Sequence, residues 1–117
     1  MIEFYGYKRC STSRKAEKCL ETAGIKYNFI DITETAPTQE LLSKIVKNSG
    51  LETKKAFNTS GVQYRELGMK DKIKEMSESQ MLEVLAGNGK LCKRPMLISG
   101  SKATIGFKEG DFQKTWV

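Results

Sequence analysis

The sequence predicts an α/β fold built on a mixed sheet, and three observations support this. The chain opens with a strand pattern, a helix pattern and a second strand pattern. Its middle carries helical patterns interrupted by glycines, and its end has two strand patterns followed by a helix. A strand–helix–strand unit makes its two strands parallel, whereas strands joined by a tight turn are antiparallel. The expected order is therefore βαβ, a helical insertion, then ββα.

The opening unit is predicted from residue periodicity. Ile2 to Tyr5 is a short apolar strand that Gly6 ends. Tyr27 to Ile32 is rich in β-forming residues that alternate, which is typical of a second strand. Between them the small and apolar residues recur at the spacing of one helix face. These residues are Ala16, Cys19, Leu20 and Ala23, with Gly24 as the expected stop.

A helical insertion is expected over about residues 37–90. Pro37 and Thr38 open its first helix, and Gly50 ends it. The buried stripe of that helix comprises Leu41, Leu42, Ile45 and Val46. Residues 51–76 indicate short helices and turns. Ser77 and Gln80 form a capping-box pattern before a last helix, which buries Met81, Leu82 and Leu85 and ends at residues 87–89.

The end of the chain predicts a hairpin and a helix. Met96 to Ser99 and Ala103 to Phe107 are strand patterns on either side of Gly100 and Ser101. Gly110 to Trp116 is the expected closing helix. No repeat, low-complexity tract or linker interrupts the sequence, so residues 1–117 are expected to form a single domain.

Composition excludes several classes of protein. Hydrophobic residues make up 38% of the 117 residues, and no stretch approaches the about 18 apolar residues of a membrane span. The N-terminus lacks the apolar region of a signal peptide, so we expect a cytoplasmic protein with reduced thiols and no membrane contact. With no histidine and three scattered cysteines, a metal site or a histidine-dependent hydrolase is not expected.

The net charge of +6 favours anionic partners, or simply a solvated surface. The sequence shows no helix-turn-helix, zinc-finger or basic-aromatic pattern. Direct binding to nucleic acid is therefore not expected.

Cys10 is the candidate reactive residue, because it stands between the first strand and the first helix. Free backbone N–H groups and the helix dipole stabilise a thiolate at a helix N-terminus. Lys8, Arg9 and Arg14 add positive charge nearby, and the hydroxyls of the segment Ser11, Thr12 and Ser13 complete a cradle suited to an oxyanion. The alternative is that Cys10 only caps the helix.

The other cysteines are assigned different places. Cys19 falls on the apolar face of the first helix and is expected to be buried. Cys92 lies shortly before Pro95, and it resolves Cys10 only if the fold brings the two together. Pro95 should mark the start of a strand, since proline cannot donate to a sheet ladder.

Several segments together resemble the ArsC/Spx family of thioredoxin-fold proteins over nearly the whole chain. The segment from Cys10 to Ala16 is similar to the family's C-x-[TS]-[SC]-R active-site motif. The segment from Lys93 to Ile98 resembles its R-P-[IL] motif. The remaining similar segments are Asp31–Ile32, Phe57–Gly61, Tyr64–Gly68 and Ile105–Phe107.

The resemblance implies a thioredoxin-like mixed sheet and an arsenate-reductase-like thiol oxidoreductase. Cys10 would be the nucleophile, with Arg94 and the segment Ser11, Thr12, Ser13 and Arg14 around the oxyanion. Pro95 would be cis and would shape the site. No bound cofactor is implied. Glutathione would be the co-substrate and glutaredoxin the reductant.

Two departures keep a second function open. Asn58 occupies the place of an arginine of glutaredoxin-linked arsenate reductases, and Lys108 is the only cation near the place of another. Ser13 replaces the second cysteine of the Spx-type C-x-x-C switch, so no disulfide with Cys10 can form there. The alternative function is that of an Spx-like transcriptional regulator binding RNA polymerase.

Overall fold

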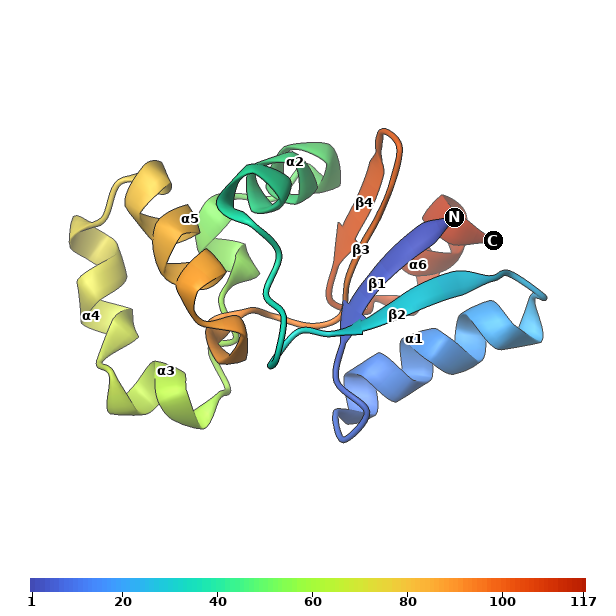
Figure 1. The fold of residues 1–117 in the computed structure, drawn as a ribbon, viewed down its shortest axis with the longest axis horizontal. Helices are drawn as coiled ribbons and strands as arrows, with labels where there is room; N and C mark the ends of the chain where they lie inside the picture. Colours follow the sequence, from blue (N-terminus) through green and yellow to red (C-terminus); the bar gives the residue numbers. More distant parts are fainter.

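The computed structural model describes residues 1–117 as a four-stranded sheet with helices on both faces (Figure 1). The strand order is β2-β1-β3-β4. β1 and β2 are parallel, and the pairs β1–β3 and β3–β4 are antiparallel, which confirms the predicted mixed sheet. The strands are β1 (Ile2–Gly6), β2 (Tyr27–Asp31), β3 (Met96–Ser99) and β4 (Lys102–Ile105).

One face of the sheet is covered by α1 (Ser11–Thr22) and α6 (Glu109–Trp116). Successive side chains of a strand point to opposite faces, so Phe4 and Leu97 turn toward these helices. A core of seven buried residues forms there. Its members are Ile2, Phe4, Ala16, Leu20, Leu97, Phe112 and Trp116.

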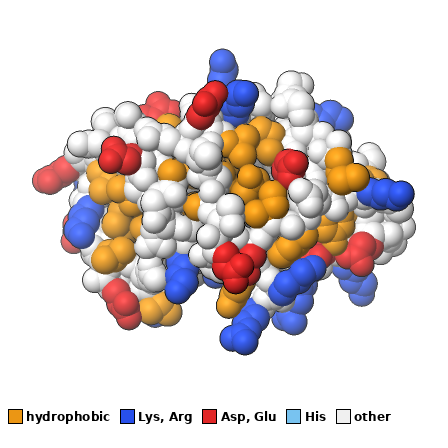
Figure 2. All heavy atoms as spheres, viewed as in Figure 1, with side chains coloured by type: hydrophobic (Ala, Val, Ile, Leu, Met, Phe, Trp, Pro, Cys, Tyr) orange, Lys and Arg blue, Asp and Glu red, His pale blue; other side chains and the backbone are white.

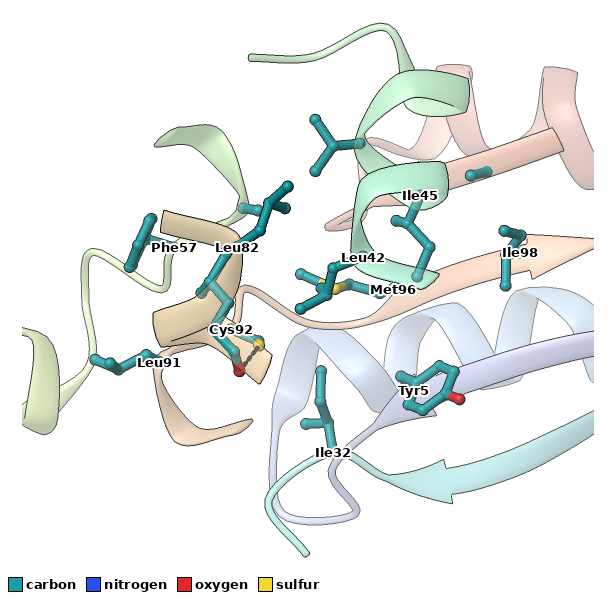
Figure 3. Packing of buried hydrophobic residues seen from close by; sticks show 14 of the residues in the cluster. Tyr5, Ile32, Leu42, Ile45, Phe57, Leu82, Leu91, Cys92, Met96 and Ile98 are labelled. Atoms are coloured by element: carbon teal, nitrogen blue, oxygen red, sulfur yellow. Dashed lines mark hydrogen bonds between the residues drawn. The ribbon is translucent and has the colours of Figure 1, made fainter. Parts of the chain in front are cut away.

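The opposite face carries the insertion. Tyr5, Met96 and Ile98 point to that side and join a second core of 15 buried residues (Figure 3). α2 (Gln39–Ser49) packs on the β3–β4 half of this face, and α5 packs on α2. The other elements of the insertion are η1 (Thr53–Ala56), α3 (Val62–Glu66), α4 (Met69–Lys72), η2 (Ile73–Glu75), α5 (Glu78–Gly87) and η3 (Gly89–Leu91).

Capping residues set the two long helices of the insertion where the sequence predicts them. The Thr38 hydroxyl accepts a hydrogen bond of 3.1 Å from the Leu41 N–H at the start of α2. At the start of α5, Ser77 and Gln80 make both hydrogen bonds of a capping box. Gly50 ends α2 in the left-handed conformation that glycine adopts without strain.

The insertion is joined to the sheet by backbone contacts. Phe57 forms a bridge with Cys92, and the Lys93 N–H donates to the Ala56 carbonyl over 2.7 Å. Gly89 packs so closely on the end of β2 that a Cβ atom there would lie 1.7 Å from the Ile32 carbonyl oxygen. The segment leading into β3 therefore contacts both the η1 end of the insertion and the end of β2.

Two predictions at the end of the chain need correction. The last strand was expected over Ala103 to Phe107, but β4 spans Lys102–Ile105. Gly106 ends it, because its φ of +81° lies outside the strand region and its N–H donates to the Pro95 carbonyl. The closing helix begins one residue earlier than expected, at Glu109.

None of the helices has both the length and the apolar character that crossing a bilayer requires. No cluster of three or more acidic or cysteine side chains is arranged to hold a metal ion.

Candidate functional site around Cys10

Cys10 is the N-cap residue of α1, reached by a tight turn from the end of β1. The Cys10 N–H donates to the Tyr7 carbonyl over 2.9 Å, which closes the turn. The Cys10 carbonyl accepts the first helical hydrogen bond, from the Arg14 N–H, over 3.0 Å. The thiol is partly exposed. The fold therefore fixes the backbone of Cys10 and leaves its side chain accessible.

The first turn of α1 offers unpaired donors to this thiol. The N–H groups of residues 11–13 precede any helical acceptor, as at every helix start. No acidic side chain stands in this turn to neutralise them. Ser13 is fully buried, and its hydroxyl oxygen accepts a hydrogen bond of 3.2 Å from the Tyr7 N–H. That contact fastens the turn to the helix.

Arg94 is brought to the site by the register of β1 and β3. Tyr5 pairs with Met96 in the antiparallel ladder, so the end of β1 meets the start of β3. The Arg94 guanidinium lies over the ring of Tyr7, 5.1 Å from its centre. The Arg94–Pro95 peptide bond is cis, as the resemblance implied. Arg94 makes no salt bridge, which leaves its charge available to an anion.

These groups act together on the pKa of Cys10. Burial is the largest single influence and raises the pKa. The Ser13 N–H and hydroxyl, the Thr12 N–H and the charge of Arg94 outweigh it, so the pKa lies below that of an ordinary cysteine. The Cys10 side chain makes no capping hydrogen bond with the backbone N–H groups of α1. We attribute the lowering to the electrostatic pull of these nearby donors on the thiolate.

A second polar group, one helical turn beyond Ser13 on the same buried face of α1, anchors the turn before Cys10. Glu17 is buried, and its carboxylate lies 2.8 Å from the Lys8 ammonium and 2.7 Å from the Tyr27 hydroxyl. Lys8 also stands over the ring of Phe29, 4.0 Å from its centre. Burial and the carboxylates of Glu17 and Glu21 raise the pKa of Tyr27. The Lys8 charge therefore interacts with Glu17 and Phe29 within the fold.

The other two cysteines lie in different surroundings. Cys92 is completely buried in the insertion-side core, and its thiol donates to the Leu85 carbonyl over 3.5 Å (Figure 3). Burial raises the pKa of Cys92 to about 12, against a weaker lowering by Arg94. Cys19 was expected to be buried. It is only partly so, at the margin of the α1-side core. All three thiols are free.

The predicted site residues occupy distinct positions around Cys10. Ser13 and Arg94 lower the pKa of the thiol, and Thr12 does so through its backbone N–H. Ser11 and Arg14 are exposed on the outer side of the helix start. Asn58 lies where the insertion meets the segment before Arg94, and its N–H donates to the Leu91 carbonyl over 2.7 Å.

Sequence patterns missed two residues that shape the site. Tyr7 supports Arg94 through its ring and holds Ser13 through its N–H. Tyr7 could have been predicted only from its position near Arg94, and that position depends on the pairing of β1 with β3. Glu17 gave a weaker signal, since it follows the core residue Ala16 and precedes the core residue Leu20 on one helix.

Fold and site together define a thioredoxin-like protein with a partly exposed thiol of lowered pKa at the start of its first helix. The sequence profile described as the ArsC family matches residues 5–115, and the chain belongs to that family. The protein YusI of Bacillus subtilis is 49% identical over 115 residues, covering 98% of each chain.

Two more distant relatives have names that state a function. The regulatory protein MgsR of Bacillus subtilis is 28% identical, with 97% of this chain and 88% of MgsR covered. The solved arsenate reductase of Vibrio cholerae has a TM-score of 0.85 at 26% identity, covering 97% and 96% of the two chains. A regulatory protein and an arsenate reductase therefore both occur among the relatives of this protein.

Proposed function

We propose that this protein is a thiol oxidoreductase of the arsenate-reductase type in which Cys10 is the single nucleophile. The observation that carries the proposal is the lowered pKa of a partly exposed thiol at the start of α1, beside an arginine without an ion-pair partner. A lowered pKa increases the thiolate fraction at neutral pH, and the thiolate is the nucleophile. The likeness to arsenate reductases supports the same class of reaction.

The reaction begins when the Cys10 thiolate replaces one oxygen of arsenate, which leaves as water after taking up protons. A glutathione thiolate then attacks the Cys10 sulfur. The sulfur–arsenic bond breaks, its electron pair stays on arsenic, and arsenite departs. Cys10 is left in a disulfide with glutathione, which a glutaredoxin thiol reduces. Two thiols are oxidised for each arsenate, so electrons balance without a bound cofactor.

The surrounding residues have separate roles in this scheme. The Arg94 guanidinium offers paired N–H donors to oxyanion oxygens. The N–H groups of residues 11–13 favour negative charge at the helix start, and the side chains of Ser11, Thr12 and Arg14 extend the cradle. Asn58 contributes no positive charge where arsenate reductases of the glutaredoxin-linked type have an arginine. This site therefore holds an oxyanion chiefly through Arg94 and the helix.

A coupled assay tests the proposal. NADPH oxidation is followed with arsenate, glutathione, glutaredoxin and glutathione reductase. We expect turnover by the wild type and by Cys19→Ser, which removes a thiol from the same helix, and no turnover by Cys10→Ser. Turnover that persists in Cys10→Ser would contradict the role of Cys10. A wild type that is inactive, although its Cys10 reacts rapidly with a thiol reagent, would exclude arsenate as substrate.

The match to MgsR favours a second candidate, a regulator that binds RNA polymerase in the manner of Spx. Because Ser13 stands in place of a second cysteine, such binding would not be switched by a disulfide with Cys10. Retention of purified RNA polymerase by the immobilised protein tests it. Equal retention by wild type and Cys10→Ser would support the regulator, and no retention by either would exclude it.

A further inference from the structure

The positive charge of the chain is concentrated around Cys10. Residues 8–18 contain five of the 20 Lys and Arg residues but only one of the 14 Asp and Glu residues. This short segment therefore carries a net charge of +4 out of the chain's +6.

Helix geometry places most of this charge on one outward stripe. Ser13, Ala16, Glu17 and Leu20 form the buried face of α1. The exposed positions recur three and four residues apart, which aligns them along the helix. They are Ser11, Arg14, Lys15, Lys18, Glu21 and Thr22, of which Glu21 is the one acidic member and accepts a hydrogen bond from the Tyr27 hydroxyl. Figure 2 shows Lys and Arg side chains gathered along the lower edge of the molecule, where α1 runs in Figure 1.

The charges of this stripe are not neutralised within the protein. The structure has three salt bridges, and the only one near Cys10 joins Lys8 to Glu17. Arg14, Lys15 and Lys18 have no acidic partner, and neither does the exposed Arg9. Four like charges therefore face solvent, from Arg9 before the thiol to Lys18 on α1. Their mutual repulsion is relieved when an acidic surface approaches.

The length of the stripe indicates the size of what it binds. Lys18 lies eight residues beyond Cys10, or about 12 Å along the helix axis. A small anionic thiol seated on Cys10 does not cover the whole stripe, whereas a protein surface does. The stripe also starts at the thiol, so a partner lying on it presents its own reactive group to Cys10.

We propose that the outward stripe of α1 (Arg14, Lys15 and Lys18, with Arg9 at its start) docks a protein whose reactive thiol lies in an acidic surface. The proposal rests on the proposed function, because the docked partner is the reductant of the Cys10 mixed disulfide. The partner thiolate attacks the outer sulfur of that disulfide. Cys10 leaves as a thiolate with the electron pair of the broken bond. The partner retains the small thiol in a new disulfide, and its own proton passes to solvent.

The experiment measures the reduction of the Cys10–glutathione disulfide of the full chain by two thiol peptides. Both are helical, of about 15 residues and thus about 22 Å long. Their single cysteine is flanked by glutamates in one and by glutamines in the other. At low ionic strength we expect the acidic peptide to react about tenfold faster. At about 1 M salt this advantage should disappear, because charges are then screened within about 3 Å.

Two matched variants locate the effect. Lys15→Glu with Lys18→Glu should remove the advantage of the acidic peptide. Lys70→Glu with Lys72→Glu makes the same charge change on exposed residues of α4, at the other end of the molecule (Figure 1), and should preserve it. The rate at which each peptide reduces a neutral aromatic disulfide corrects for any difference in intrinsic reactivity between the two peptide thiolates. Glutathione serves as a small anionic thiol, and its rate should change little in either variant.

The outcomes separate the two proposals. A normal Cys10 mixed disulfide that both peptides reduce equally fast overturns the docking proposal alone. The proposal is also overturned if the Lys15 and Lys18 changes slow reduction by glutathione as strongly as reduction by the acidic peptide. The stripe would then bind small anions. Failure of Cys10 to form the mixed disulfide overturns both proposals.

Discussion

Cys10 and Cys92 show how the same side chain acquires opposite chemistry in two regions of one small protein. Cys10 begins a helix, and backbone donors, Ser13 and Arg94 lower its pKa against the effect of burial. Cys92 is buried in the core between the sheet and the insertion, where burial raises its pKa to about 12. Arg94 acts on both thiols in the same direction, so the difference comes from solvent exclusion and from the helix start. Position in the fold therefore decides in which direction the pKa of each thiol moves.

The largest expected effect separates the two cysteines directly. At pH 7 a thiol with the pKa of Cys92 has a thiolate fraction of about 10⁻⁵. Brief alkylation of the folded protein with iodoacetamide, read by peptide mass spectrometry, should modify Cys10 at least a thousandfold faster than Cys92. In denaturant both should react. Comparable labelling of Cys92 in the folded protein would show that its burial is wrongly assigned.

The junction that holds the Cys92 region against the sheet can be broken at Gly89. A Cβ atom there would lie 1.7 Å from the Ile32 carbonyl oxygen, so Gly89→Ala should lower the free energy of unfolding by about 3 kcal/mol. Gly87→Ala is the matched control, because nothing lies within 4 Å of its added Cβ. Chemical denaturation of the two variants makes the comparison. Equal stability would refute the close approach.

The turn that carries Cys10 depends on Glu17. Glu17→Ala leaves the Lys8 ammonium and the Tyr27 hydroxyl without their shared acceptor, and should cost about 2 kcal/mol of stability. Glu21→Ala removes an exposed acceptor of the same hydroxyl and should cost about 0.5 kcal/mol or less. Denaturant unfolding tests both. A larger loss for Glu21→Ala would mean that Glu17 does not anchor the turn.

The two thiols should also give opposite pH dependence of stability. Above about pH 8.5 the unfolded chain releases the Cys92 proton while the folded protein keeps it, so folding loses up to about 1.4 kcal/mol per pH unit until pH approaches 12. The lowered pKa of Cys10 works the other way. Its stabilisation is present above the unfolded pKa and is lost as pH falls through the folded pKa.

Unfolding curves of wild type and Cys92→Ala between pH 7.5 and about pH 9.5 should reveal the Cys92 contribution. Other groups titrate equally in both proteins, so the wild type should lose stability more steeply by about 1 kcal/mol over this range. Parallel curves would show that Cys92 ionises normally in the folded protein.

Local signals in the sequence were sufficient for most of the fold. The capping residues Thr38 and Ser77 predicted the starts of α2 and α5 correctly. The end of β4 was misjudged because Phe107 is a strong strand former, and the positive φ of Gly106 overrode its preference.

The candidate site likewise has a part that local sequence signals predict and a part that they do not. Cys10 and Ser13 were predictable because a helix start positions residues that are neighbours in sequence. The place of Arg94 came from family resemblance, and its contact with Tyr7 depends on the pairing of β1 with β3. The buried role of Glu17 likewise requires knowing that Lys8 and Tyr27 both donate to its carboxylate. Contacts between distant segments were the part that patterns could not supply.

The central claim is that the start of α1 and Arg94 together activate Cys10, and the pH dependence of Cys10 alkylation tests it most directly. The rate should rise with a midpoint below the ordinary cysteine value of about 8.5. In Arg94→Ala the midpoint should move to higher pH, since the cation that lowers the pKa of Cys10 is gone. Arg65→Ala, on an exposed residue of α3, should leave it unchanged. A wild-type midpoint at or above that of a free cysteine would contradict the account.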